Sequence, residues 1–404
     1  MTTSDQHNMA NAPMYRANTA MVLPGGGARA AYQVGVLKAL AEIHGKRPGN
    51  PFPILAGTSA GGINAASLAA GAHHFTGTIQ QLELLWRELS TDKIYRADLF
   101  GVMRNALRLA HSLFNPTQTV VKPVALLDNS PLRKLLSEHV RFENISRNIL
   151  NRDLEAFCLT AMNYTEGVSE TFFQGGPQYA GWQRWRRQGV ATPIQLQHLM
   201  ASTAIPTIFP PAKIGRFFYG DGALRQLTPI SPVIHLGANR VLVIPANGHK
   251  RQYPKLPKTI QSPGFGQIIG HLLNSAFIDS IETDIERLER INELIRLVPD
   301  ENLSLMGKEL LPIDCLVISP SEDIDRIADE HVKELPRSLR MFLSGSGSNG
   351  GGGVSISSYL LFTPEYCGKL IDLGYRDGME QRQELTDFLY RSEPDEHKGH
   401  EAPE

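Results

Sequence analysis

Short apolar runs and amphipathic segments alternate through the first part of the chain. Thr19–Leu23 is apolar and ends at Pro24, and the next segment, Ala30–Ala41, has its large apolar residues at helical spacing. A second apolar run, Phe52–Ala56, precedes a glycine-bounded turn and the alanine-rich segment Ile63–Ala70. This strand–helix–strand–helix order predicts parallel βαβ units with right-handed crossovers.

Later apolar runs predict that the sheet continues. Strands are expected at Ala156–Asn163, Val241–Pro245 and Cys315–Ser319. The last two are almost wholly apolar, as strands buried on both faces of a sheet should be. We therefore predict an α/β fold of three layers, α/β/α, in which helices cover both faces of a mainly parallel central sheet.

One long segment departs from this alternation. Phe277–Val298 has isoleucine and leucine at steps of three and four residues, with charged residues on the opposite side. Because it lies between two strand candidates, we expect it to belong to a helical insertion at about residues 255–310. The glycine-rich segment Ser344–Gly353 is expected to be a loop, since it lacks the strand-to-helix context that phosphate binding requires.

The chain is expected to form one α/β domain between polar ends. Residues 1–17 and 391–404 are predicted to be disordered. The domain at 18–390 comprises a core at 18–247 that carries the chemical motifs, the helical insertion, and strands and helices at 311–390.

Composition narrows the functional classes. The 40 Lys+Arg and 41 Asp+Glu residues nearly cancel, which argues against nucleic-acid binding, because that needs a surplus of basic side chains. No segment reaches the roughly 18 apolar residues of a membrane-spanning helix. The polar N-terminus lacks the apolar stretch of a secretory signal, and the three cysteines are widely spaced, so a cytoplasmic location is expected. No cluster with metal-ligand spacing is visible, and neither a metal nor another cofactor is predicted.

The strongest chemical signal is the turn Gly57-Thr58-Ser59-Ala60-Gly61, which follows an apolar strand and precedes a helix. A G-x-S-x-G sequence in this setting is typical of a nucleophile elbow, a strained turn that projects the serine hydroxyl toward a helix N-terminus. Gly57 and Gly61 are expected because larger side chains would collide with the neighbouring strand and helix. When this motif is considered by itself, an ordinary tight turn is the alternative.

A second glycine cluster, Gly25-Gly26-Gly27-Ala28-Arg29, also lies between a strand and a helix. Its backbone N–H groups can converge at a helix N-terminus, where they would bind a phosphate or stabilise an oxyanion. Gly25-x-Gly27-x-x-Ala30 fits a loose dinucleotide-binding pattern, but Glu42, the only acid near the expected ribose position, falls in a helix. An oxyanion hole ahead of a nucleophile elbow explains both glycine clusters together.

A serine nucleophile needs a base, and the sequence offers Asp221, which lies between Gly220 and Gly222 after the aromatic strand Arg216–Tyr219. The glycines would let the carboxylate approach a hydroxyl closely, although the same residues suit a tight hairpin turn. The remaining candidates for a base are expected to be structural or solvent-facing; they are His73, His74, His198 and His235.

Together, the segments that carry these residues resemble the patatin-like phospholipases. The matching motifs are GGGARAAYQVGVL (25–37), GTSAGG (57–62), LLDNSPLRKLL (126–136), ASTAIPTIFPP (201–211) and DGA (221–223). The resemblance implies the patatin-like form of the predicted fold and a Ser–Asp dyad of Ser59 and Asp221. It also implies an oxyanion hole in the loop Gly25–Arg29, formed by the amides of Gly26, Gly27 and Ala28 with Arg29 nearby. Asp221-Gly222-Ala223 stands where the family usually has DGG, a variant that the family tolerates. Residues from about 250 to 390 resemble the C-terminal part of longer bacterial members.

The reaction that this resemblance implies is hydrolysis of carboxylic esters in phospholipids or lysophospholipids, of the phospholipase A or lysophospholipase type. Two alternatives stay open at this point. One is an acyltransferase that uses the same serine, and the other is a nucleotide- or lipid-binding module without catalysis.

A lipid substrate must leave a bilayer or micelle, and Leu99–Phe114 is a candidate surface for that contact. Its apolar residues recur with helical period, while Arg104, Arg108 and His111 occupy the other side. No acidic residue occurs from Leu99 to Leu127. Such a helix could lie peripherally on anionic lipid or cover the site as a lid, and a core-packing helix with solvent-facing arginines is the alternative.

Overall fold

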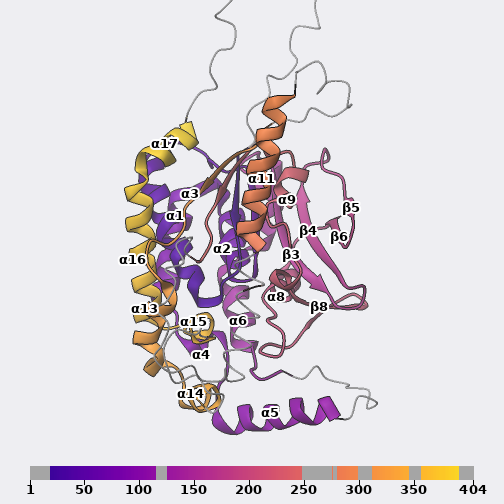
Figure 1. The fold of residues 1–404 in the computed structure, drawn as a ribbon, viewed down its shortest axis with the longest axis vertical. Helices are drawn as coiled ribbons and strands as arrows, with labels where there is room; N and C mark the ends of the chain where they lie inside the picture. The colour runs from indigo at the N-terminus through magenta and orange to yellow at the C-terminus, as the bar shows by residue number, and fades with distance from the viewer. Residues whose placement is uncertain are drawn as a thin grey trace, which may run out of the picture.

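A ten-stranded sheet runs through the middle of the molecule (Figure 1). The computed structural model describes residues 19–114, 125–247, 280–298, 312–344 and 356–390, together with Ser275. The strand order is β10-β9-β1-β2-β3-β4-β6-β5, and β7 and β8 join the sheet outside this path, where β8 pairs with β3. The strands are β1 (Thr19–Leu23), β2 (Ile54–Thr58), β3 (Ala156–Asn163), β4 (Val168–Gly175), β5 (Trp182–Arg184), β6 (Arg187–Ala191), β7 (Ala212–Ile214), β8 (Phe217–Asp221), β9 (Arg240–Val243) and β10 (Asp314–Val317).

The strands from β10 to β3 along this order are all parallel to their neighbours. The chain runs outward from β1 through β2 to β3 on one side and returns to β9 and β10 on the other. The order therefore reverses between β1 and β9, and the carboxyl ends of parallel strands at such a point open onto a crevice where ligands bind. The predicted α/β class with a mainly parallel central sheet is confirmed. Beyond β3, antiparallel pairs such as β3–β4 and β5–β6 extend the sheet, and the sequence patterns did not predict them.

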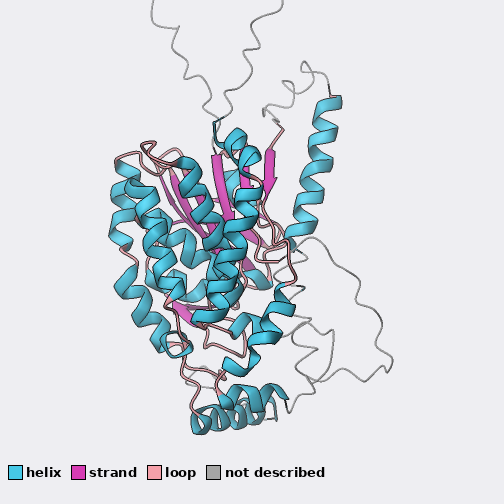
Figure 2. Cartoon of the chain, turned by 90° about the vertical axis from the view of Figure 1, so that its left-hand side faces the viewer, coloured by secondary structure: helices cyan, strands magenta, loops and turns pink. Residues whose placement is uncertain are grey.

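Helices cover both faces of the sheet. Successive residues of β1 point to opposite sides, and each side packs against a different set of helices. Met21 and Leu23 belong to a large core cluster shared with α1 (Ala31–His44), α3 (Phe75–Arg87) and α16 (Pro364–Glu380). Figure 2 shows helices of this layer in front of the strands. Ala20 and Val22 belong to a second cluster, shared with α9 (Ser231–His235) and α11 (Ser280–Leu297).

The remaining helical elements connect these layers or lie at their ends. They are α2 (Ser59–Ala70), α4 (Thr91–Ile94), α5 (Leu99–Phe114), α6 (Ser130–His139), α7 (Phe142–Leu150), α8 (Leu196–Ser202), α13 (Ile324–His331), α14 (Arg337–Ser344), α15 (Ser357–Leu360) and α17 (Arg382–Tyr390), with the 3-10 turns η1 (Gly27–Ala30), η2 (Ala72–His74), η3 (Gly222–Leu224) and η5 (Val332–Glu334).

Strand β10 lies at the edge of the sheet, with Asp314 exposed and its other residues half-buried. Leu316 packs against the first core cluster, whereas Cys315 and Val317 pack against the second. The strand therefore contacts both helical layers, as its apolar composition predicts, but it is less deeply buried than β9.

Parts of the predicted domain organisation lie outside the described residues. Residues 1–17 and 391–404 are not described, and neither is most of the predicted loop at 344–353. Of the predicted insertion at 255–310, the described part is mainly α11, whose inner residues Ile281, Ile285 and Leu288 pack against the sheet. No helix among the described residues has the length and apolar character to cross a bilayer.

Candidate active site

Ser59 occupies the junction between β2 and α2 in a left-handed backbone conformation, with φ at 54°. A non-glycine residue in this region costs on the order of 1–3 kcal/mol, and it persists only where the surroundings enforce it. Here the flanking glycines allow close contact on both sides. A Cβ at Gly61 would lie 2.1 Å from the carbonyl oxygen of Leu23, and one at Gly57 would lie 2.6 Å from the Cα of Gly62. This tight strand-to-helix turn has the geometry expected of a nucleophile elbow.

The backbone of Ser59 is also held by helix α8. The Ser59 amide donates to the hydroxyl oxygen of Ser202 at 2.9 Å, and that hydroxyl donates to the carbonyl oxygen of Thr160 at 2.7 Å. Both serines are buried. Ser202 lies within the motif ASTAIPTIFPP, but its contact with the elbow could not be foreseen, because a serine in a helix carries no signal of what it faces.

The register of the sheet brings Asp221 beside Ser59. Strand β2 pairs with β3 as far as Thr58, which lies opposite Thr160. At the next residue of β3, Ala161, the pairing passes to β8, and its partner there is Asp221. Strand β4 occupies the other side of β3 at both positions. Strand β8 therefore takes the place beside β3 that β2 leaves when the chain turns into the elbow, and the two predicted residues meet at this point.

Asp221 ends β8 and leads into the 3-10 turn η3, so the hairpin-turn alternative for this segment is wrong. Gly222 is required by close packing, because a Cβ on it would lie 2.2 Å from the carbonyl oxygen of Thr160. Its φ is not positive, so backbone conformation is not the reason for a glycine here. The Asp221 carboxylate is wholly buried, and its Oδ1 accepts a hydrogen bond from the Ala223 amide at 3.0 Å.

Burial sets the electrostatics of Asp221. Loss of solvent raises the pKa of its carboxyl group to about 7, while hydrogen bonding to the Ser59 hydroxyl and the Ala223 amide opposes this rise. Within the described structure, Oδ2 is buried without a hydrogen bond of ordinary geometry, so the bond to Ser59 is long or poorly aligned. Hydrogen bonds between catalytic groups commonly have this character in free enzymes and tighten with substrate.

The glycine loop follows the carboxyl end of β1 and lies next to both the elbow and the residues after β9. A Cβ on Gly61 would lie 2.3 Å from the carbonyl oxygen of Pro24, and one on Gly26 would lie 2.8 Å from the Cβ of Ala246, just after β9. Gly25 precedes the 3-10 turn η1 at Gly27–Ala30. The first amides of such a turn have no partners within it and remain available as donors. Gly27 has φ at 56° and packs so closely that a Cβ would lie 2.3 Å from the carbonyl oxygen of Tyr359.

The Arg29 side chain is the main link between this loop and the C-terminal region. It is buried, with its guanidinium 4.1 Å above the centre of the Tyr359 ring. Its Nε and Nη2 donate to the Ser358 hydroxyl at 2.9 and 2.6 Å, and Nη2 also donates to the Asp325 carboxylate at 2.5 Å. Nη1 donates to the side chain of Asn247. These partners come from different elements, and no sequence motif indicated them.

The structure does not support the dinucleotide alternative. Glu42, the acid considered for a ribose, accepts a hydrogen bond from the Tyr375 hydroxyl at 2.6 Å and pairs with Arg382 at 3.5 Å. Gly27 packs against Tyr359, where a pyrophosphate would have to approach the loop.

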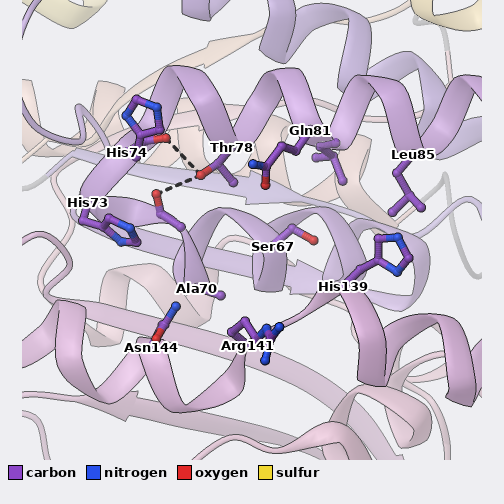
Figure 3. Close-up of a pocket in the computed structure, with 12 residues that line it drawn as sticks. Ser67, Ala70, His73, His74, Thr78, Gln81, Leu85, His139, Arg141 and Asn144 are labelled. Carbon is purple, nitrogen blue, oxygen red and sulfur yellow. Dashed lines mark hydrogen bonds between the residues drawn. The ribbon is translucent and has the colours of Figure 1, made fainter.

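The predicted histidines lie in structural or surface positions. His198 is buried, its ring is 4.7 Å from that of Phe172, and its Nδ1 accepts a hydrogen bond from the Gln195 amide. His73 and His74 line a cavity of about 260 Å³ between α2, α3 and the α6–α7 connection, together with His139 and Arg141 (Figure 3). Neither Ser59 nor Asp221 lines this cavity. Within the described part of the chain, no group of histidine, cysteine, aspartate and glutamate side chains is arranged to hold a metal ion.

Comparison with known proteins places these residues in a family. The family model described as patatin-like phospholipase matches residues 21–234, a range that includes the glycine loop, the elbow and Asp221. The chain belongs to the patatin-like phospholipase family. It is 27% identical over 216 residues to a cGAMP-activated phospholipase of Pseudomonas aeruginosa (strain BWHPSA011 / Pa011), which covers 54% of this chain and 54% of the relative. The chain thus matches about half the length of that curated relative. Among solved structures, VipD from Legionella pneumophila aligns with a TM-score of 0.36 and 14% identity, over 92% of this chain and 67% of that one.

Proposed function

We propose that this protein is a lipolytic acyl hydrolase that cleaves carboxylic esters of phospholipids or lysophospholipids through Ser59 and Asp221. The observation that carries the proposal is the exchange of β2 for β8 beside β3, which brings a strained serine and a wholly buried carboxylate together. Membership of the patatin-like phospholipase family supports lipolytic hydrolysis as the general activity.

Asp221 has the basicity that the first step requires. A general base works best when its pKa lies near the working pH, and burial raises that of Asp221 to about 7. The Ser59 oxygen attacks the acyl carbonyl while its proton passes to Asp221. Asp221 then returns this proton to the departing lysolipid or glycerol oxygen, and the acyl group stays on Ser59. A water molecule then attacks the acyl-enzyme while its proton passes to Asp221. The fatty acid leaves as Asp221 gives this proton to the Ser59 oxygen, which restores both groups.

The glycine loop supplies the stabilisation of negative charge. In both halves of the reaction the carbonyl oxygen becomes an oxyanion, and we assign the amides of Gly26, Gly27 and Ala28 to it. Removing one such donor costs about 3–4 kcal/mol of transition-state stabilisation in other hydrolases. The Arg29 guanidinium is committed to Asp325 and Ser358, so its part in the site is to hold the loop.

The test is mass spectrometry of lipid products from wild type, Ser59→Ala and Asp221→Asn. Ser67→Ala is the matched control, because Ser67 lies on the same helix and its hydroxyl only donates to the Ile63 carbonyl oxygen. Phospholipid and lysophospholipid are supplied with and without cGAMP, since the curated relative is described as cGAMP-activated. We expect free fatty acid from wild type and Ser67→Ala only.

Two outcomes would decide against the proposal. Near-normal turnover by Asp221→Asn would exclude the dyad, and lipid binding without any product from wild type would favour a binding module. Adding an acceptor alcohol separates the remaining alternative, because an acyltransferase would yield a new ester in place of fatty acid.

A further inference from the structure

Helix α5 exposes large apolar side chains on one face. Leu99, Phe100, Met103 and Leu107 are 53%, 79%, 52% and 65% exposed, and their spacing places them along one side of the helix. Single exposed apolar residues are normal on protein surfaces, but a continuous set of them marks an interaction site. We call these four residues the α5 apolar face.

The other side of α5 is the side that contacts the protein. Val102 is buried, and the Asn105 side chain donates to the carbonyl oxygen of Leu126 at 3.3 Å. The Asp98 carboxylate accepts from the Gly101 amide at 2.7 Å and fixes the start of the helix. Figures 1 and 2 both show α5 lying across one end of the molecule, apart from the sheet. The apolar face is therefore turned outward, and the core-packing alternative is wrong for these four residues, although Val102 on the opposite side does pack in the core.

Basic residues border the α5 apolar face. Arg104, Arg108 and His111 are exposed, and the helix contains no acidic residue. Helix α14 contacts α5 and adds Met341, which is 61% exposed, and Arg337, which is also exposed. An outward apolar face beside arginines is the pattern of a helix that lies in the interface of an anionic bilayer.

The position of α5 relates it to the candidate active site. Leu126 and Leu127, beside α5, donate through their amides to the carbonyl oxygens of Thr207 and Ile208 at 2.8 and 2.9 Å. Those residues follow α8, whose Ser202 hydroxyl accepts a hydrogen bond from the Ser59 amide. A short series of contacts thus connects α5 with the nucleophile elbow.

From these observations we propose that the α5 apolar face and its arginines dock the protein on anionic phospholipid bilayers. This proposal rests on the proposed function, because a lipid hydrolase finds its substrate in the bilayer. The apolar side chains enter the region between headgroups and acyl chains, and Arg104 and Arg108 contact lipid phosphates. Docking in this way would bring the bilayer to the end of the molecule where α5 lies, which is connected to α8 and the elbow by the contacts described above.

The experiment is sedimentation with vesicles of phosphatidylcholine alone or mixed with phosphatidylglycerol, all in the Ser59→Ala background to prevent hydrolysis. Met103→Glu/Leu107→Glu disrupts the apolar face, and Arg104→Glu/Arg108→Glu reverses the charge. The matched controls are Leu84→Glu/Leu150→Glu, which changes exposed leucines on α3 and α7, and Arg133→Glu/Arg290→Glu, which changes exposed arginines on α6 and α11. Each protein is also made with Ser59 intact and assayed on a water-soluble short-chain ester.

We expect the parent and both controls to bind the anionic vesicles equally. The apolar variant should lose at least tenfold in affinity. The charge reversal should lose more than about 25-fold, since each of the two basic side chains contributes about fivefold near an anionic surface and the added glutamates are repelled by it. Hydrolysis of the soluble ester should be unchanged in every variant that retains Ser59. If the wild type fails to hydrolyse this ester, the proposed function is contradicted. The vesicle sedimentation would still decide the docking proposal, because it measures binding and not hydrolysis.

Three results would overturn the docking proposal. They are parent-level vesicle binding by both α5 variants, no vesicle binding by the parent, and equal losses in the control variants. Light scattering of each protein tests whether a second copy of the chain, and not lipid, covers the α5 apolar face. If wild type forms a dimer that Met103→Glu/Leu107→Glu dissociates, the face is a contact between copies of the chain and the proposal is wrong.

Discussion

The candidate nucleophile elbow and the glycine loop lie side by side at the carboxyl ends of the central strands β1 and β2, but they are held in different ways. The elbow is fixed by contacts of its own glycines with β1 and α2, and by one hydrogen bond that the Ser59 amide donates to Ser202 of α8. The glycine loop depends on partners far along the chain. Asp325 and Ser358 lie 296 and 329 positions after Arg29, and Tyr359 packs against Gly27.

The difference shows which parts of the chain the site needs. The elbow, Asp221 and the loop itself all fall within residues 21–234, the range that matches the family model. The residues that hold Arg29 all fall after it. A clamp of Asp325, Ser358 and Asn247 on a buried arginine thus makes the C-terminal region a structural part of the proposed oxyanion hole.

The largest expected effect is on the elbow side, at Asp221, the proposed base. Asp221→Asn keeps the acceptor for the Ala223 amide but cannot take the Ser59 proton. We expect kcat on a soluble ester to fall by about 10³-fold, within the range of roughly 10²–10⁴ that general-base catalysis contributes. The same variant should be more stable than wild type at pH 8, because it removes a buried charge. Thermal melts of both proteins at pH 8 and at pH 4 measure this. A difference in melting temperature between variant and wild type that is the same at both pH values would contradict the burial argument.

The sign of that pH dependence follows from the raised pKa. The folded protein binds the Asp221 proton more tightly than the unfolded chain, in which the aspartate has its ordinary pKa of 3.8. Stability contributed by this group is therefore present below about pH 4 and is lost as the pH rises to about 7. Catalysis has the opposite trend, since the deprotonated carboxylate is the base. Because about half of the Asp221 carboxyl groups are deprotonated at pH 7 and about 1% at pH 5, we expect kcat/KM for a soluble ester to fall about 50-fold between these pH values. A flat profile over this range would exclude Asp221 as the base.

The sequence predicted the elbow side better than the loop side, for a physical reason. Ser59 and Asp221 lie in short glycine-rich turns, where steric needs restrict the residue types, and such turns leave a pattern. Asp325 and Ser358 sit in ordinary helices, and nothing in their neighbourhood indicates a partner near the other end of the chain. Likewise β5, β6 and β7 are short strands with exposed residues, which no apolar alternation marks. The burial of Asp221 could not be predicted, because it depends on the sheet register that pairs this residue with Ala161 of β3.

A moderate effect is expected from the clamp on the glycine loop. Asp325→Ala leaves the buried Arg29 guanidinium without its carboxylate partner. We expect kcat on the soluble ester to fall about 10- to 100-fold with KM nearly unchanged, because the loop acts on the oxyanion and not on the bound ester. Asp325→Asn keeps one acceptor for Arg29 and should recover part of the loss.

The matched control for the clamp is Asp329→Ala, which removes an exposed carboxylate from the same helix. It should leave kcat and KM unchanged. If Asp325→Ala lowers only the melting temperature and not kcat, the C-terminal region supports folding alone and the proposed link to the oxyanion hole is wrong.

The smallest expected effect is at Ser202, and it tests whether the elbow is held locally. Ser202→Ala leaves the buried Ser59 amide and Thr160 carbonyl without their shared partner, which costs about 1–3 kcal/mol of stability. The flanking glycine contacts remain, so the elbow should keep its turn and kcat should fall only a few-fold. The control is Thr203→Ala, which removes the hydroxyl of the next residue and its hydrogen bond to the Leu199 carbonyl oxygen. It measures the effect of destabilising the end of α8 without removing a contact to Ser59. A loss of kcat at Ser202 as large as that at Asp325 would mean that the elbow also depends on a single distant contact, and the contrast between the two sides of the site would disappear.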